Sequence, residues 1–273
     1  MPPVLPMDIE REVFEATAYF HHKSIPTLLL VAHRVKKWVE PLLYRVVVFT
    51  HARVRNDDFT TRLSIALQSR TRSHSDSDLL RHVHHLLFTQ TDSRPLHEVL
   101  AKCTAVQNLV LLHFPRDSGF LPLISGMPLR RLTTTLSDLF FPAPIDFAHP
   151  LFAHLTHLEL VDNFRQSDWD GWKGLALIPN LTHLAFLFEI PAPIINGALA
   201  DCPALQILII LESWPTEVSV QDPRFLIMKA PPLFEDWNIG ARGGDDLWVR
   251  AEKFIARRKS SEVERGGSIL VDP

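Results

Sequence analysis

Histidine is the residue type through which this chain could most readily do chemistry, since fourteen occur among its 273 residues. Neutral imidazole is a common metal ligand, and His157 and His183 together with Glu159 could approach a ligand set. Zinc takes three or four ligands in fixed geometry, usually with supporting hydrogen bonds. Two histidines at equivalent positions of a repeated pattern are explained by the repetition alone. We therefore predict no metal site and no cofactor.

The two cysteines fit a structural role better than a chemical one. Cys103 and Cys202 each lie three residues before the first apolar position of a repeat, so they are equivalent sites. Four strand-to-strand spacings would separate them by roughly 19 Å, whereas a disulfide needs Cα atoms within about 7 Å. We expect two free, buried thiols.

Motifs of the familiar catalytic classes do not occur. The sequence holds no P-loop, GxSxG, GxGxxG, HExxH or CxxC. A reactive cysteine needs an accessible and activated setting, and the repeat phase of Cys103 buries it. We predict a protein that is not an enzyme and has no catalytic residue.

An acidic and aromatic cluster is formed by Asp168, Trp169, Asp170 and Trp172. One interpretation is a helix that begins after a capping Asp168, with tryptophan packed inward. The alternative is a hot spot for a partner, where tryptophan is enriched. We favour the first.

The elements that must position these residues follow from one pattern, apolar-x-x-apolar-x-apolar. Its six copies recur every 23 to 26 residues, an interval that fits one short strand and one return segment, and they begin at Val83, Val106, Leu129, Leu155, Leu181 and Leu205. The copy from Leu155 to Asn163 resembles the leucine-rich repeat signature LxxLxLxxN. That resemblance implies an α/β fold, a right-handed leucine-rich-repeat solenoid. Helices are expected in the return segments over 96–102, 119–126, 167–177 and 193–201.

Side chains alternate between the two faces of a strand. The residues on either side of the middle leucine should therefore form two columns on the concave face. The first column is His85, Asn108, Arg131, His157, His183 and Ile207, and the second is Leu87, Val110, Thr133, Glu159, Ala185 and Ile209. We expect this face to contact a target protein, partly through Arg131, His157, Glu159 and His183.

The sequence divides into three parts. Residues 1–49 are predicted to form a helical unit that leads into a first strand. Its second helix opens at Ser24-Ile25-Pro26, and Pro41 either ends this helix or begins the next segment. Residues 50–228 hold the repeats, preceded by a helix over 57–70 and a polar surface loop over 70–78, and end in a further strand at 224–228. Residues 229–273 carry the last helix and a tail.

The last helix is predicted over 245–258, with Asp245 or Asp246 as its cap. Its apolar stripe comprises Leu247, Trp248, Ala251, Phe254 and Ile255. A solenoid needs its last strand covered, so we interpret this helix as a C-terminal cap.

Residues 5–49 also resemble an F-box. The matching features are Leu5, Pro6, Ile9, Val13, Phe14, Leu28, Leu29, Val31 and the exit Pro41-Leu42-Leu43-Tyr44. One departure is Val35, which stands where the family usually has tryptophan, while Trp38 follows three residues later. Together with the repeats, the stretch 240–244 and the last helix, nearly the whole chain is similar to the large F-box-like family of mushroom-forming fungi.

This resemblance implies a substrate receptor of a Skp–cullin–F-box ubiquitin ligase. Its partners would be a Skp-type adaptor protein and an unknown target protein, and the adaptor contact would fall on Leu5, Pro6, Ile9, Leu28, Leu29 and Val31. The alternative is a leucine-rich-repeat interaction scaffold with a degenerate F-box and no ligase role. We expect a monomer outside such a complex.

Composition narrows the classes of partner. The net charge is −3 without a strong basic surplus, which argues against nucleic acid. No apolar run approaches the ~18 residues that span a bilayer, and the first residues lack the features of a secretory signal. We therefore expect no membrane partner and a cytoplasmic or nuclear location, or both.

Overall fold

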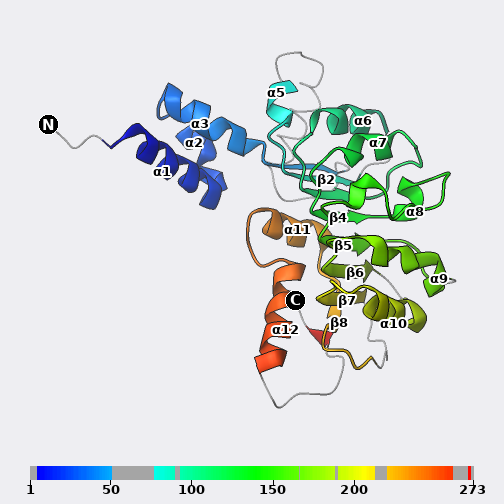
Figure 1. Cartoon of the computed structure of the whole chain (residues 1–273). Helices are drawn as coiled ribbons and strands as arrows, with labels where there is room; N and C mark the ends of the chain where they lie inside the picture. The colour runs from blue at the N-terminus through cyan, green and yellow to red at the C-terminus, as the bar shows by residue number, and fades with distance from the viewer. Residues whose placement is uncertain are drawn as a thin grey trace.

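A parallel sheet in which each strand lies beside the next strand of the sequence forms the centre of the computed structural model (Figure 1). The structure describes residues 5–50, 77–89, 93–165, 167–187, 190–212, 220–260 and 270–271. The strands are β1 (Val46–Thr50), β2 (His85–Thr89), β3 (Asn108–Leu111), β4 (Arg131–Thr134), β5 (His157–Leu160), β6 (His183–Leu187), β7 (Ile207–Glu212), β8 (Phe225–Lys229) and β9 (Leu270–Val271). The mixed α/β class is confirmed.

The register of the sheet confirms both predicted columns. Each residue of the first column, from His85 to Ile207, is paired with the next, and the same holds for the second column from Leu87 to Ile209. The predicted strand at 224–228 is β8, and it pairs with β7. Repeat spacing is therefore enough to set the register of this sheet.

One face of the sheet is covered by the return segments, which lie on one side of the strands in Figure 1. They contain α5 (Ser77–Leu80), α6 (Ser93–Lys102), α7 (Phe120–Ser125), α8 (Leu136–Leu139), η3 (Pro150–Phe152), α9 (Trp169–Trp172), η4 (Lys173–Leu177) and α10 (Ala192–Asp201). Between them and the sheet lies the main apolar core, which includes the middle leucine of every repeat. Replacing such a fully buried leucine by alanine costs about 2–5 kcal/mol.

Asp162 is a buried polar residue that links two return segments. Its carboxylate accepts hydrogen bonds from the backbone N–H groups of Leu136 and Ser137, at 2.8 and 2.9 Å. Asn163, the last position of the repeat signature, is exposed instead. The polar anchor after β5 is thus the residue before the one that the signature marks.

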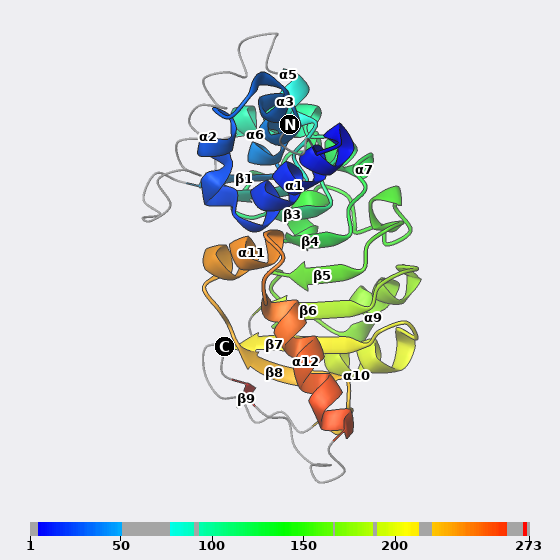
Figure 2. The same ribbon diagram turned by 90° about the vertical axis from the view of Figure 1, so that its left-hand side faces the viewer.

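The opposite face of the sheet is covered by α11 (Leu233–Ala241) and α12 (Leu247–Ser260), and Figure 2 shows α12 crossing in front of β7 and β8. The predicted helix and its stripe are confirmed, because Leu247, Trp248, Ala251 and Ile255 are buried and Phe254 is partly buried. The stripe covers the sheet face and not only the last strand. The burial of this helix therefore extends beyond the last predicted strand that the cap interpretation considered.

A separate helical unit stands at the β1 end of the sheet (Figure 1). It consists of α1 (Met7–Phe20), η1 (His22–Ser24), α2 (Ile25–Leu28) and α3 (His33–Leu43). Its small core contains Ala18, Ile25, Val35 and Val39. Val35 therefore fills an interior position of this unit.

The predicted second helix is interrupted where the sequence suggested continuity. It breaks between α2 and α3, and Pro41 lies inside the last turn of α3 and does not end it. A proline removes one helical hydrogen bond, but Val35 and Val39, four residues apart, are both buried and keep α3 in place. The predicted helix over 57–70 and all but the end of the loop over 70–78 lie outside the described residues.

Candidate functional site

The two columns form what we call the covered face, the sheet surface beneath α11 and α12. We expected it to be accessible to a target protein, and the structure shows that it is not. Glu159 and His183 are buried, and Arg131 and His157 are partly buried. The columns also contain apolar side chains, among them Ile207, Ile209 and Val110, which are stable only when they are covered. The C-terminal helices cover them and bury the polar members of the columns as well.

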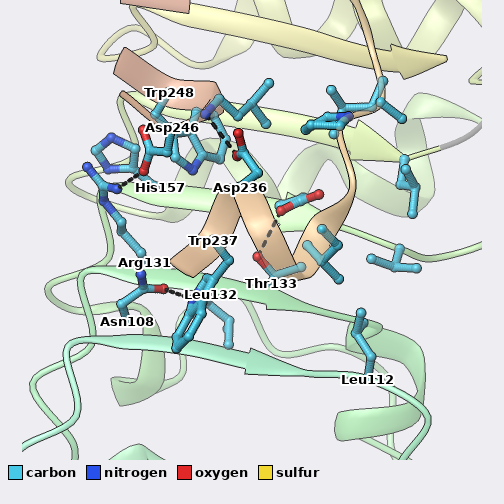
Figure 3. A pocket seen from close by; sticks show the side chains of 18 residues that line it. Asn108, Leu112, Arg131, Leu132, Thr133, His157, Asp236, Trp237, Asp246 and Trp248 are labelled. Atoms are coloured by element: carbon cyan, nitrogen blue, oxygen red, sulfur yellow. Dashed lines mark hydrogen bonds and ion pairs between the residues drawn. The ribbon is translucent and has the colours of Figure 1, made fainter. Parts of the chain in front are cut away.

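Asp246 and Asp236 anchor α12 to the covered face. Asp246 accepts from the backbone N–H of Val249, which makes it the helix cap, and its other oxygen lies 2.6 Å from Nη1 of Arg131 (Figure 3). Asp236 of α11 accepts from the N–H of Leu247 and pairs with Arg250 at 2.7 Å. These contacts place the start of α12 beside α11 and over β4.

Gly240 allows this arrangement, because a Cβ atom at this position would clash with the Asp246 carboxylate. Gly243, with φ at +81°, supplies the left-handed turn between α11 and α12. The stretch 240–244 thus has a packing function in joining the two helices.

Two further polar residues of the columns find partners inside the molecule. Trp237 Nε1 of α11 donates to Asn108 Oδ1 at 3.1 Å, and Thr133 Oγ1 donates to Glu159 Oε2 at 2.9 Å (Figure 3). Burial, and then the nearby Asp236 charge, raise the pKa of Glu159 to about 7, against the lowering effect of the Thr133 hydrogen bond. A target could reach Glu159 only after α11 moves.

His157 and His183 stack on each other beneath α12. Their ring centroids are 4.1 Å apart and the rings are nearly parallel, at 7°. Trp248 of α12 meets both rings edge-on, at 5.1 and 5.8 Å. Burial is the main cause that lowers the pKa of His157 to about 2 and of His183 to about 4, so both rings are neutral at pH 7.

A small cavity of about 60 Å³ remains between the covered face and the helices, lined by residues that include Arg131, Glu159, Asp236 and Trp248 (Figure 3). Sites for small organic ligands occupy about 300–1,000 Å³. This space suits a few water molecules better.

The helical unit has a second candidate surface. Leu5, Pro6, Ile9 and Val31, four of the expected adaptor contacts, are exposed. The other two, Leu28 and Leu29, are partly buried against the core of the unit. Met7, Val13, Tyr19, Phe20 and Leu30 are exposed as well, and the sequence analysis did not assign them to this surface.

The remaining candidates have structural roles. Asp168 Oδ1 accepts from the N–H of Gly171 and caps α9, while Trp172 is buried, as the first interpretation expected. Cys103 and Cys202 are free and buried, and burial raises their thiol pKa values to about 12 and 11. Thiolates are therefore disfavoured at both positions.

Sequence reasoning missed Glu252, whose Oε1 lies 3.2 Å from His183 Nε2. Its only signal was its place on the predicted last helix. No helix within the described residues is long and apolar enough to cross a bilayer. A comparison with protein-family models and with curated proteins finds no match for this chain.

Proposed function

We propose that this chain is a non-catalytic substrate receptor of a Skp–cullin–F-box ubiquitin ligase, with α1–α3 as the F-box-like unit and the sheet as a leucine-rich-repeat solenoid. The observation that carries the proposal is the concentration of exposed apolar side chains on the helical unit. Among the described residues, eight large ones lie in residues 5–31, namely Leu5, Met7, Ile9, Val13, Tyr19, Phe20, Leu30 and Val31. Three lie elsewhere, namely Phe141, Leu177 and Ile239.

Exposed apolar side chains concentrated in one unit support protein binding. Leu30 is 85% exposed and Phe20 is 74% exposed, whereas the unit keeps only four residues fully buried. A small helical unit that leaves eight large apolar side chains in water gains stability when a partner covers them. The adaptor contact would use Leu5, Pro6, Ile9 and Val31, with Leu28 and Leu29 shaping the surface from beneath.

Target binding at Arg131, His157, Glu159 and His183 would require α11 and α12 to leave the covered face. The Arg131–Asp246 pair and the packing of Trp248 oppose that departure. The receptor would therefore bind its target by displacing its own C-terminal helices or through another surface. Other subunits of the ligase would carry out the chemistry of ubiquitin transfer.

Co-purification with a Skp-type adaptor tests the proposal. We expect a stoichiometric complex with the wild-type chain, and a complex weakened at least tenfold by Ile9→Asp and by Val31→Asp, because each puts a charge into an apolar contact. Leu177→Asp is the matched control, since Leu177 is 64% exposed on η4, away from the helical unit. A complex that survives both N-terminal substitutions, or no complex with folded wild-type protein, contradicts the adaptor role.

A repeat scaffold without a ligase role is the second candidate. It is favoured by Val35, which fills an interior position where the F-box family has tryptophan, and by the partial burial of Leu28 and Leu29. In that case the apolar surface would bind a partner other than a Skp-type adaptor. This candidate would be supported if the wild-type chain forms no complex with the adaptor but co-purifies with another protein in stoichiometric amount. Ile9→Asp should then weaken binding of that other protein.

A further inference from the structure

Three side chains with metal-ligating atoms meet where α12 crosses β5 and β6. They are His157, His183 and Glu252, and their nearest donor atoms all lie within 4.8 Å of one another. The carboxylate is not Glu159, the one suggested by the sequence, because Glu159 bonds to Thr133 on the neighbouring strand. This junction is therefore made by tertiary packing between two strands and a distant helix.

The hydrogen bonds of two threonines determine which ring nitrogen carries the proton. His157 Nδ1 lies 2.8 Å from Thr156 Oγ1, and His183 Nδ1 lies 2.8 Å from Thr182 Oγ1. Each hydroxyl donates its single hydrogen to a backbone carbonyl, that of Arg130 at 3.0 Å or of Thr156 at 3.1 Å. Each hydroxyl can then only accept from the ring, so the proton of the neutral ring sits on Nδ1.

The lone pairs consequently lie on both Nε2 atoms. Each Nε2 is buried and has no hydrogen-bond partner among the residues that the structure describes. The close approach of Glu252 Oε1 to His183 Nε2 lacks hydrogen-bond geometry, and the two atoms are both acceptors in this tautomer. His183 is only 5% exposed. Two acceptor nitrogens and a carboxylate thus lie close together, and none of them faces a described hydrogen-bond donor. A bound cation would stabilise this arrangement.

We propose that His157, His183 and Glu252 bind a divalent transition cation of the zinc class, with water as a further ligand. Two imidazoles and one carboxylate match the ligands that Zn²⁺ takes, whereas Mg²⁺ and Ca²⁺ prefer oxygen ligands throughout. The threonine hydroxyls supply the second hydrogen bond that orients a ligating histidine. The nearby Arg131 cation is already neutralised by Asp246.

Binding requires a modest rearrangement. Bonds of about 2.1 Å to a tetrahedral ion place donor atoms about 3.4 Å apart, closer than the present limit of 4.8 Å. The stacked rings must tilt toward a common point, and the Glu252 side chain, 51% exposed, is free to change rotamer. The bound ion would tie β5 and β6 to α12 and so hold the C-terminal helix on the covered face.

Zinc titration of the purified full-length chain, in competition with a chromophoric chelator, tests the site. We expect one ion per chain with micromolar or tighter affinity, and visible absorption when Co²⁺ replaces Zn²⁺. Glu252→Gln and His183→Gln should each weaken binding at least tenfold, and Thr182→Val should weaken it about 10–100-fold by releasing the ring. Glu98→Gln and His154→Gln are matched controls at exposed positions of α6 and of the loop before β5.

Glu252→Gln is the decisive variant because its side chain is half exposed and its loss should leave the fold intact, which a circular dichroism spectrum checks. Absence of zinc binding by the wild type overturns the proposal. Equal binding by Glu252→Gln and wild type does so too, since the ion would then be held by other histidines. In either case His157 and His183 are a stacked structural pair.

Discussion

Among single side chains, the buried and partly buried titratable groups of the covered face have opposite effects on how the free energy of unfolding changes with pH. Burial raises the pKa of Glu159 from 4.5 to about 7, so the folded state holds a proton that the unfolded chain releases between those values. Burial lowers the pKa values of His85, His157 and His183 from 6.5 to about 3, 2 and 4. Below pH 6.5 these histidines therefore bind protons in the unfolded chain but stay neutral in the folded state, which lowers the free energy of unfolding.

Between pH 6 and 5 the three histidines should determine the sign of the pH dependence, because the unfolded chain gains up to three histidine protons while the folded state holds one extra proton on Glu159. Each proton contributes a slope of about 1.4 kcal/mol per pH unit, so these four groups together make the free energy of unfolding fall on acidification by about 3 kcal/mol per unit. His183→Gln should reduce the slope by about one proton and Glu159→Gln should steepen it by about one. Urea unfolding at both pH values, with a chelator present, measures the slopes.

His154→Gln, at an exposed position of the loop before β5, is the matched control for this comparison. A slope unaltered by His183→Gln would mean that His183 takes up its proton in the folded state as readily as in the unfolded chain. That outcome would contradict its burial beneath α12.

Among the elements, α12 determines what the sheet presents to its surroundings. Its buried side chains pack on Ile207, Ile209, Leu211, Leu226 and Met228 of β7 and β8. Those strands are apolar on both faces, as expected for a parallel sheet covered on both sides. An accessible concave face would have left these side chains in water, and this explains why the open surface expected from the repeats does not occur.

Ala251→Asp should detach α12 from the sheet. Ala251 is fully buried, and an unpaired carboxylate there costs several kcal/mol. We expect destabilisation by at least about 3 kcal/mol, together with faster hydrogen exchange in α12, β7 and β8. Ala256→Asp, at an exposed position of the same helix, should change stability by less than about 0.5 kcal/mol. Equal effects of the two substitutions would contradict the observed packing of α12.

In the whole molecule, the helical unit and the sheet are distinct bodies of packing. The unit has its own core of Ala18, Ile25, Val35 and Val39, while the repeats share one continuous core from Tyr44 to Ile227. The described links between them include Arg45 stacked over Tyr19 at 4.9 Å. If the unit binds a partner as proposed, this arrangement predicts that the sheet keeps its structure.

A chain that begins at Tyr44 should consequently retain a folded sheet. We expect a cooperative thermal transition and the strand signal of the full chain by circular dichroism, since Tyr44 and β1 stay in place to cover β2. This shortened chain should also lose the proposed adaptor complex. Aggregation or a non-cooperative transition would show that α1–α3 stabilise the repeats.

The sequence by itself determined the repeating part of this protein. The spacing of the leucines sets the strands, their parallel order and the two columns, because each repeat contacts only its neighbours and local pattern decides the register. The same spacing indicated free, buried cysteines, and the stripe from Leu247 to Ile255 indicated a buried helix face.

Only the tertiary structure decided where that helix face is buried. An apolar stripe shows that a helix must be covered, but it does not specify the surface that covers it. In this fold α11 and α12 pack on the apolar members of the columns, such as Val110 and Ile209. This packing buried Glu159, joined Arg131 to Asp246 and brought Glu252 to His157 and His183. Contacts between residues so distant in sequence depend on how the whole chain folds, since no short pattern spans them.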